Sequence, residues 1–178
     1  MLVSALTDRL RQLPVNQADA IDVGFLTYER EVRAMCEMNS CGRYGRSWNC
    51  PPQVGSIEAL EAKCGAYRNG ILLNTVNALE DSFDFEGMMA AGVALHNILV
   101  EVNGIAAREF RLDAYLLLGA GSCSACKTCA HPEPCRHPEE RFIPIEACGV
   151  NVVSLAKNTG FRYNNGPNTV TFFGLLLF

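Results

Sequence analysis

The chain has 178 residues, about half of them apolar, and a formal net charge of −4. This size predicts one domain over residues 1–178 with a core of its own, and the acidic balance argues against sequence-independent nucleic-acid binding. No export signal is visible, and no stretch approaches the roughly 18 uncharged apolar residues that span a bilayer. We therefore expect a cytoplasmic protein that binds neither nucleic acid nor membranes.

The first third of the chain predicts one helix followed by a long loop. Residues 1–13 are amphipathic and end at Pro14, which cannot continue a helix. Residues 20–35 are ambiguous: residues 21–29 could form a strand, and the segment after them leads into the first cysteines. Residues 36–55 are rich in cysteine, glycine and proline and predict a loop.

A further helix is expected directly after this loop. Ser56 is a typical N-cap residue, and Ile57, Leu60 and Cys64 recur at helical spacing on one apolar face. Free cysteine is among the most buried residue types. We therefore expect Cys64 in the hydrophobic core and not at a metal.

Strands and helices alternate over the rest of the chain. Strands are predicted at 69–77, 112–118 and 169–177, and helices from Asp81 or Ser82 to Asn103-Gly104 and from about Ile145 to Asn158. This order predicts an α/β or α+β fold, with one sheet, helices packed on one face of it, and two cysteine-rich loops at one end.

Eight of the nine cysteines fall into two sets with spacing that suits metal ligation. The sets are Cys36, Cys41 and Cys50, and Cys123, Cys126, Cys129, Cys135 and Cys148. In a reducing location such clusters indicate metal binding more than disulfides, and thiolates this close in sequence cannot pair with each other without strain.

The second set indicates an iron–sulfur cluster in particular. Cys123, Cys126 and Cys129 form a C-x2-C-x2-C run, which matches the first three ligands of the bacterial ferredoxin pattern, although Cys135 follows after five residues instead of three. Eight thiolates are enough for two [4Fe-4S] clusters. Zinc is the main alternative, because Cys126, Cys129 and Cys135 with His137 would also make a four-ligand site.

The spacing leaves open which cysteines share a site. In one arrangement, Cys148 completes a site with the C-x2-C-x2-C run, and Cys135 completes the first set. In the other, Cys135 closes the site of the run, and the first set keeps an open position. Closed sites favour electron transfer, whereas an open position favours chemistry on a substrate.

Three histidines and one tryptophan are further candidates. His96 lies at the edge of an apolar helical stripe, where a core or boundary histidine is expected more often than a ligand. His131 and His137 lie inside the second cysteine loop, as solvated side chains or as ligands. Trp48 either shields a cluster from water or packs under the first loop.

Two segments of the chain resemble a known family. The motifs C-x4-C-x2-YGRSWNCPP (36–52) and GAGSCSACKTCAHPEPCRHPEERFIPIEACGVNV (119–152) are similar to those of prokaryotic "predicted metal-binding proteins", a domain of unknown function. The resemblance implies metal ligation by seven cysteines: Cys36, Cys41, Cys50, Cys123, Cys126, Cys129 and Cys135. It is less specific for Cys148, because Ile145 stands where a small polar residue is expected.

Two classes of function remain from the sequence. One is a redox protein whose one or two [4Fe-4S] clusters pass electrons to a partner enzyme or a small molecule. The other is a structural or regulatory zinc protein. A cluster enzyme with an open iron position is a third hypothesis, and no motif identifies a reaction or an oligomeric state.

Overall fold

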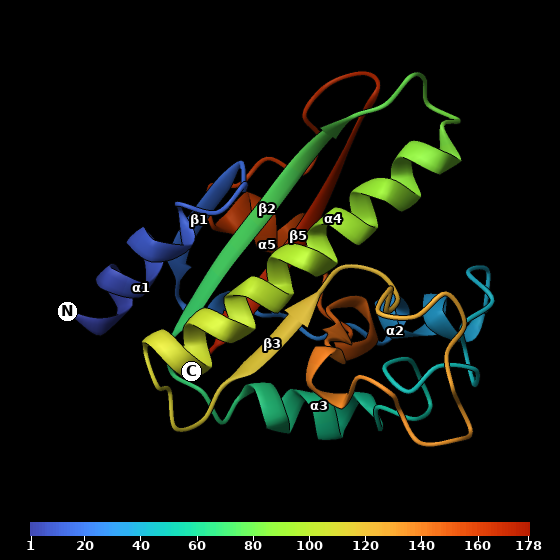
Figure 1. The fold of residues 1–178 in the computed structure, drawn as a ribbon, viewed down its shortest axis with the longest axis horizontal. Coiled ribbons are helices and arrows are strands. Elements are labelled where there is room, and N and C mark those ends of the chain that lie inside the picture. Colours follow the sequence, from blue (N-terminus) through green and yellow to red (C-terminus); the bar gives the residue numbers. More distant parts are fainter.

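The computed structural model describes residues 1–178, which form one open, five-stranded sheet with helices packed on it (Figure 1). The strand order is β1-β2-β5-β3-β4. The strands are β1 (Gln17–Ile21), β2 (Gly70–Ala78), β5 (Thr169–Leu177), β3 (Leu116–Gly119) and β4 (Ile143–Pro144). Every pair is antiparallel except β3–β4. The fold is therefore α+β, as the sequence predicts.

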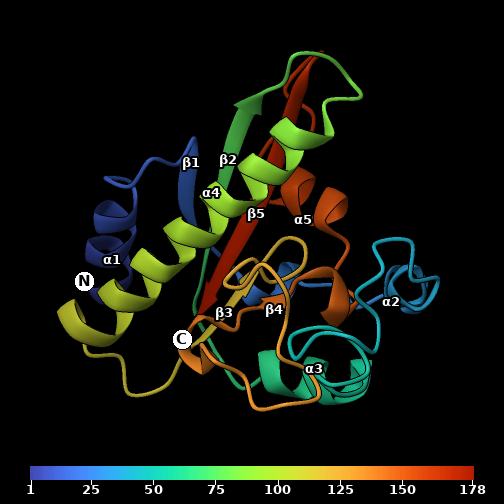
Figure 2. The ribbon, with the colours of Figure 1, turned by 45° about the vertical axis from the view of Figure 1, so that its right-hand side comes forward.

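Helices cover both faces of the sheet, where the sequence analysis expected one (Figure 2). On one face lie α1 (Leu2–Leu10) and α4 (Phe85–Gly104), and on the other lie α3 (Ile57–Cys64) and α5 (Val152–Asn158). Both faces are covered because the central strands carry apolar side chains on both of their sides. Successive leucines such as Leu72 and Leu73 point to opposite faces, and both are fully buried, so each face needs a cover.

The predicted ends of the helices agree best with the structure where the sequence contains a clear capping residue. The Ser56 hydroxyl accepts the N–H of Ala59 at 3.2 Å and caps α3. The helix expected over 145–158 is instead split into a short turn, η4 (Glu146–Cys148), and α5. Gly149 separates them with φ of 79°, a left-handed conformation that ends the first turn.

Helix α4 approaches the sheet closely at two glycines. A Cβ atom on Gly119 would lie 2.4 Å from Leu99 Cδ1, and one on Gly174 would lie 2.7 Å from Leu99 Cδ2. Both glycines therefore allow the close approach of helix to strand. Since Gly119 ends β3 and the second cysteine loop starts just after it, this contact positions the start of that loop.

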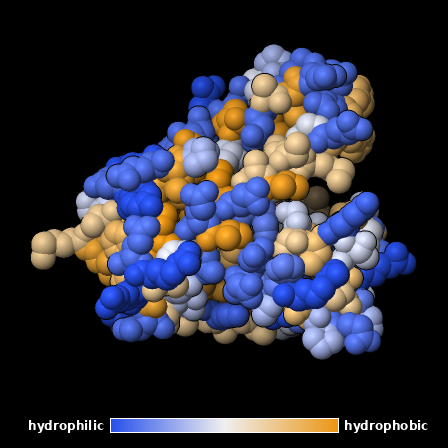
Figure 3. Space-filling model, viewed as in Figure 1, coloured by the Kyte–Doolittle hydropathy of each residue, from blue (hydrophilic) through white to orange (hydrophobic).

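One helix is long and apolar enough to cross a bilayer by length and composition alone, which the sequence analysis did not anticipate. It comprises α4 and a wider helical turn, η2 (Ile105–Glu109), 25 residues in all. In this fold Leu95, Leu99 and Val102 pack it against the sheet. Its N-terminal half leaves apolar side chains exposed, and Figure 3 shows apolar atoms along this side of the molecule.

The two cysteine-rich loops lie at the same end of the molecule (Figure 1). The first follows α2 (Arg30–Glu37) and the second follows β3, and neither contains a helix or strand over 38–56 or 120–137. The remaining short turns are η1 (Val23–Phe25) and η3 (Pro138–Glu140). This placement is the one that the sequence predicts.

Candidate metal centre

Four cysteines of the second loop line one cavity together with part of the first loop. The lining residues are Ser47, Trp48, Asn49, Cys123, Ala125, Cys126, Cys129, Ala130, Cys135, Arg136, His137 and Arg141. Each of the four thiols is partly buried. The charges of Cys126, Cys135 and Cys129 each raise the pKa of Cys123, so the four thiols are near one another.

Donors from both loops point at the sulfur of Cys129. Burial alone would raise the pKa of this thiol, but the backbone N–H groups of His131 and Trp48, the Ser47 hydroxyl and the Arg43 guanidinium together hold the pKa below its usual value. Such donors stabilise the thiolate, which is the form that binds metal. At Cys123 burial dominates and raises the pKa.

Asn49 and Trp48 connect the first loop to the second. The Asn49 side chain is buried, accepts the Ser47 hydroxyl at 2.7 Å and donates to the Phe142 carbonyl at 2.9 Å. Trp48 Nε1 donates to the Glu133 carbonyl at 2.8 Å. These bonds hold one wall of the cavity to the chain that carries the cysteines. Trp48 also meets the His131 ring edge to face, with the ring centroids 4.8 Å apart.

The three cysteines of the first set lie beside this cavity. Burial, together with the charges of Cys41 and Cys36, raises the pKa of Cys50 to about 11, so the three thiols are neighbours. Burial and the Glu146 carboxylate raise the pKa of Cys36. Cys41 is exposed and lines a surface groove with Cys129. The two sets therefore share a neighbourhood, as the sequence analysis expected.

Arg33 fixes the base of the first loop. Its guanidinium is buried and donates to the Ala147 carbonyl at 2.6 Å and to the Gly55 carbonyl at 2.8 Å. A single side chain thus joins α2, the end of the first loop and the turn η4. Arg33 cannot be recognised from the sequence, because nothing in the local pattern shows which distant carbonyls it meets.

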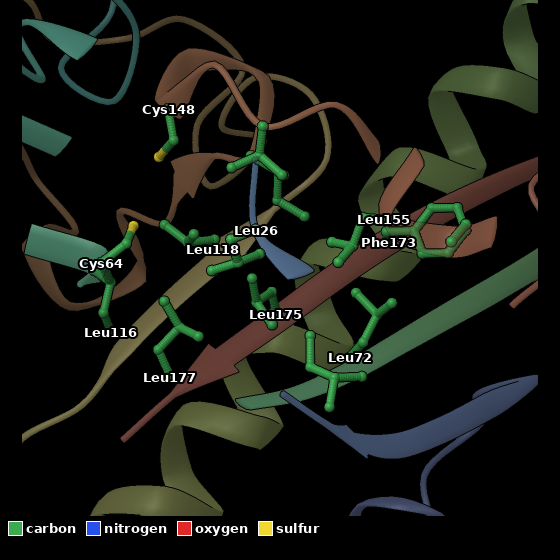
Figure 4. Close-up of a cluster of buried hydrophobic side chains, with 14 of the residues drawn as sticks. Leu26, Cys64, Leu72, Leu116, Leu118, Cys148, Leu155, Phe173, Leu175 and Leu177 are labelled. Atoms are coloured by element: carbon green, nitrogen blue, oxygen red, sulfur yellow. The ribbon is translucent and has the colours of Figure 1, made fainter. Parts of the chain in front are cut away.

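Cys148, the eighth predicted ligand, lies in the hydrophobic core beside Cys64 (Figure 4). Both thiols are essentially inaccessible to solvent, and they are hydrogen-bonded to each other, with the Tyr28 hydroxyl also bonded to Cys64. The bond to Cys64 and burial raise the pKa of Cys148. The core position predicted for Cys64 is confirmed, and Cys148 shares it.

The donor set of the cavity fits a thiolate-bound metal. It combines four thiols, N–H donors to sulfur and the cationic groups of Arg136 and Arg141 on the lining. The model of one family matches residues 19–178. The chain belongs to the family of predicted metal-binding proteins called DUF2284. No curated protein and no solved structure matches the chain significantly.

Proposed function

We propose that this DUF2284 protein is an iron–sulfur protein in which Cys123, Cys126, Cys129 and Cys135 hold one [4Fe-4S] cluster. The observation that carries the proposal is the convergence of these four thiols on one cavity. The third cysteine of the C-x2-C-x2-C run favours iron, because a zinc site needs only a pair at that spacing. The N–H and hydroxyl groups at Cys129 suit the hydrogen bonds that tune the potential of such clusters.

The proposed role is electron transfer in the cytoplasm to a partner protein or a small molecule. A cluster supplies reversible one-electron transfer when bound. Four protein thiolates leave no iron position for a substrate, by the same logic that separates structural from catalytic zinc sites. The loop at 121–137 contains no buried residue, so a partner would reach the site without a change of fold.

A second site at Cys36, Cys41 and Cys50 is the natural extension of this proposal. Because Cys148 packs against Cys64 and Cys135 lines the other cavity, this set has three thiols and lacks a fourth. A cluster held there would keep one position for a ligand that is not cysteine. That position would suit binding of a small molecule.

Anaerobic purification followed by iron, sulfide and zinc analysis tests the proposal. We expect about four iron and four sulfide per chain for the closed site alone, or about eight of each if the first set also holds a cluster. Zinc in whole-number ratio without sulfide, in protein made with ample iron and without oxygen, would contradict it. That result would favour the zinc alternative.

A further inference from the structure

A surface groove beside the metal centre carries positive charge and no negative charge. It runs between the two cysteine loops, and its lining includes Cys41, Arg43 and Arg46 of the first loop and Cys129 and His131 of the second. No carboxylate lines this groove, although the chain has 19 acidic and only 15 basic residues. We call it the arginine groove, and its charge is opposite to that of the chain as a whole.

The two arginines of the groove have no acidic partner within the chain. Arg9, Arg11 and Arg30, which lie outside both loops, each form an ion pair with a carboxylate. Neither Arg43 nor Arg46 takes part in an ion pair. Arg46 is exposed and Arg43 is half-buried. An unpaired guanidinium keeps its charge and its planar set of donors available for a carboxylate of another molecule.

Positive charge continues from the arginine groove to the cysteine cavity. Cys129 lines both of these hollows. The arginines on the cavity are Arg136 and Arg141, and no carboxylate lines it. Four arginines on two loops therefore border two hollows that share Cys129. A single small anion contacts only one or two such groups, whereas the acidic patch of a protein extends over all of them.

We propose that the arginine groove and the adjoining cavity form the docking surface for a partner protein that presents an acidic patch. Opposite charges on the two surfaces orient the partner and raise the rate of encounter. Because Cys129 lines both hollows, a partner bound here comes close to a thiol of the metal centre. The role of this partner as an electron carrier rests on the proposed function, whereas its acidic patch follows from the charges of the surface alone.

Binding of a fluorescein-labelled decaglutamate peptide to the anaerobically purified protein, measured by fluorescence anisotropy, tests this surface. We expect binding at about 0.01 M salt, where charges act over roughly 30 Å, and much weaker binding at about 0.15 M, where they act over roughly 8 Å. Arg46→Glu places a carboxylate in the groove and should weaken binding by about tenfold, because like charges repel. Arg162→Glu, in the segment between α5 and β5 that lies away from both loops (Figure 1), changes the net charge equally and should lose far less affinity.

The outcomes separate this surface from the metal centre. The proposal is overturned if the peptide does not bind at low salt or if Arg46→Glu and Arg162→Glu bind it equally well. It is also overturned if inorganic phosphate displaces the peptide more strongly than chloride at equal ionic strength, which would indicate a site for a small anion.

Iron and sulfide are counted in the same samples. Their absence with unchanged peptide binding contradicts only the proposed function, whereas a failure to bind the peptide in protein that contains them contradicts only the docking surface. Should Arg46→Glu fail to fold, Arg46→Gln removes the charge of the same exposed side chain and should weaken binding by a smaller factor.

Discussion

The central sheet and the second cysteine loop are held together in different ways. Strands β2 and β5 pair along their full length, from Gly70 with Leu177 to Ala78 with Thr169, and most of their leucines are completely buried. The segment 121–137 contains no buried residue and no helix or strand. Its four cysteines nevertheless face one cavity.

We infer from this contrast that burial of apolar side chains stabilises the sheet, whereas a bound metal stabilises the second cysteine loop. The sheet buries apolar side chains on both faces, so we expect it to stay folded without a ligand. The loop has no such core, so we expect its order to depend on ligation, whose free energy is coupled to folding of the ligating segment. The two regions should therefore respond to different mutations.

The largest effect is expected at the cysteine cavity. Cys126→Ala should abolish metal binding by the second loop, because it removes one of four thiolates. Hydrogen exchange should show lost protection over residues 120–137, while β2 and β5 keep theirs. If protection in β5 fell equally, the sheet would depend on the metal and the contrast would be wrong.

The core should respond in the opposite way. Leu95→Ala, at a buried position that joins α4 to the sheet, should lower the free energy of unfolding by about 2–5 kcal/mol. Metal content per folded chain should stay unchanged. Val93→Ala, on the exposed side of the same helix, is the control and should change stability by less than about 0.5 kcal/mol. Denaturant unfolding and metal analysis measure both quantities.

Asn49 tests the connection between the regions. Asn49→Ala removes the bond to the Phe142 carbonyl and leaves that oxygen unpaired, which should cost about 1–3 kcal/mol. Metal should also be lost faster to a chelator, because one wall of the cavity is no longer tied to the cysteine segment. Asn97→Ala, an exposed change on α4, should alter neither property. Equal chelation rates in both variants would show that the wall plays no part.

The smallest effect is expected at the cysteine pair in the core. Cys64→Ala should keep the full metal content and lose about 1 kcal/mol, as small buried truncations do. The reason is that Cys64 contacts Cys148, Tyr28 and leucine side chains and lies outside the cysteine cavity. A variant that lost metal would show that the core pair and the metal sites are linked.

The sequence predicts this molecule well where local signals decide the structure. Strands β2 and β5 each contain a run of buried leucines, and Ser56 caps a helix at the expected residue. The placement of both cysteine loops at one end follows from the ends of the strands and helices that they connect. Each of these features is determined by residues that are close together in the sequence.

Features that depend on distant contacts are outside the reach of such patterns. The position of Cys148 beside Cys64 follows from the packing of η4 on α3. The spacing of the cysteines along the chain does not predict this contact. The partners of Arg33 lie 22 and 114 residues away along the chain. His96 was expected to be a satisfied core histidine, whereas its unpaired nitrogen becomes evident only when η3 is seen beside α4.

The central position of β5 has a consequence for the order in which the protein is made. This strand is the last of the five in the chain, yet it joins β1 and β2 to β3 and β4. During synthesis the sheet remains in two separate parts until residues 169–177 leave the ribosome, because long-range strand pairs form only after both strands are available. Until then β3, which leads into the second cysteine loop, has no antiparallel partner. Metal delivery is therefore expected after translation of these residues, when the loop first has a fixed support.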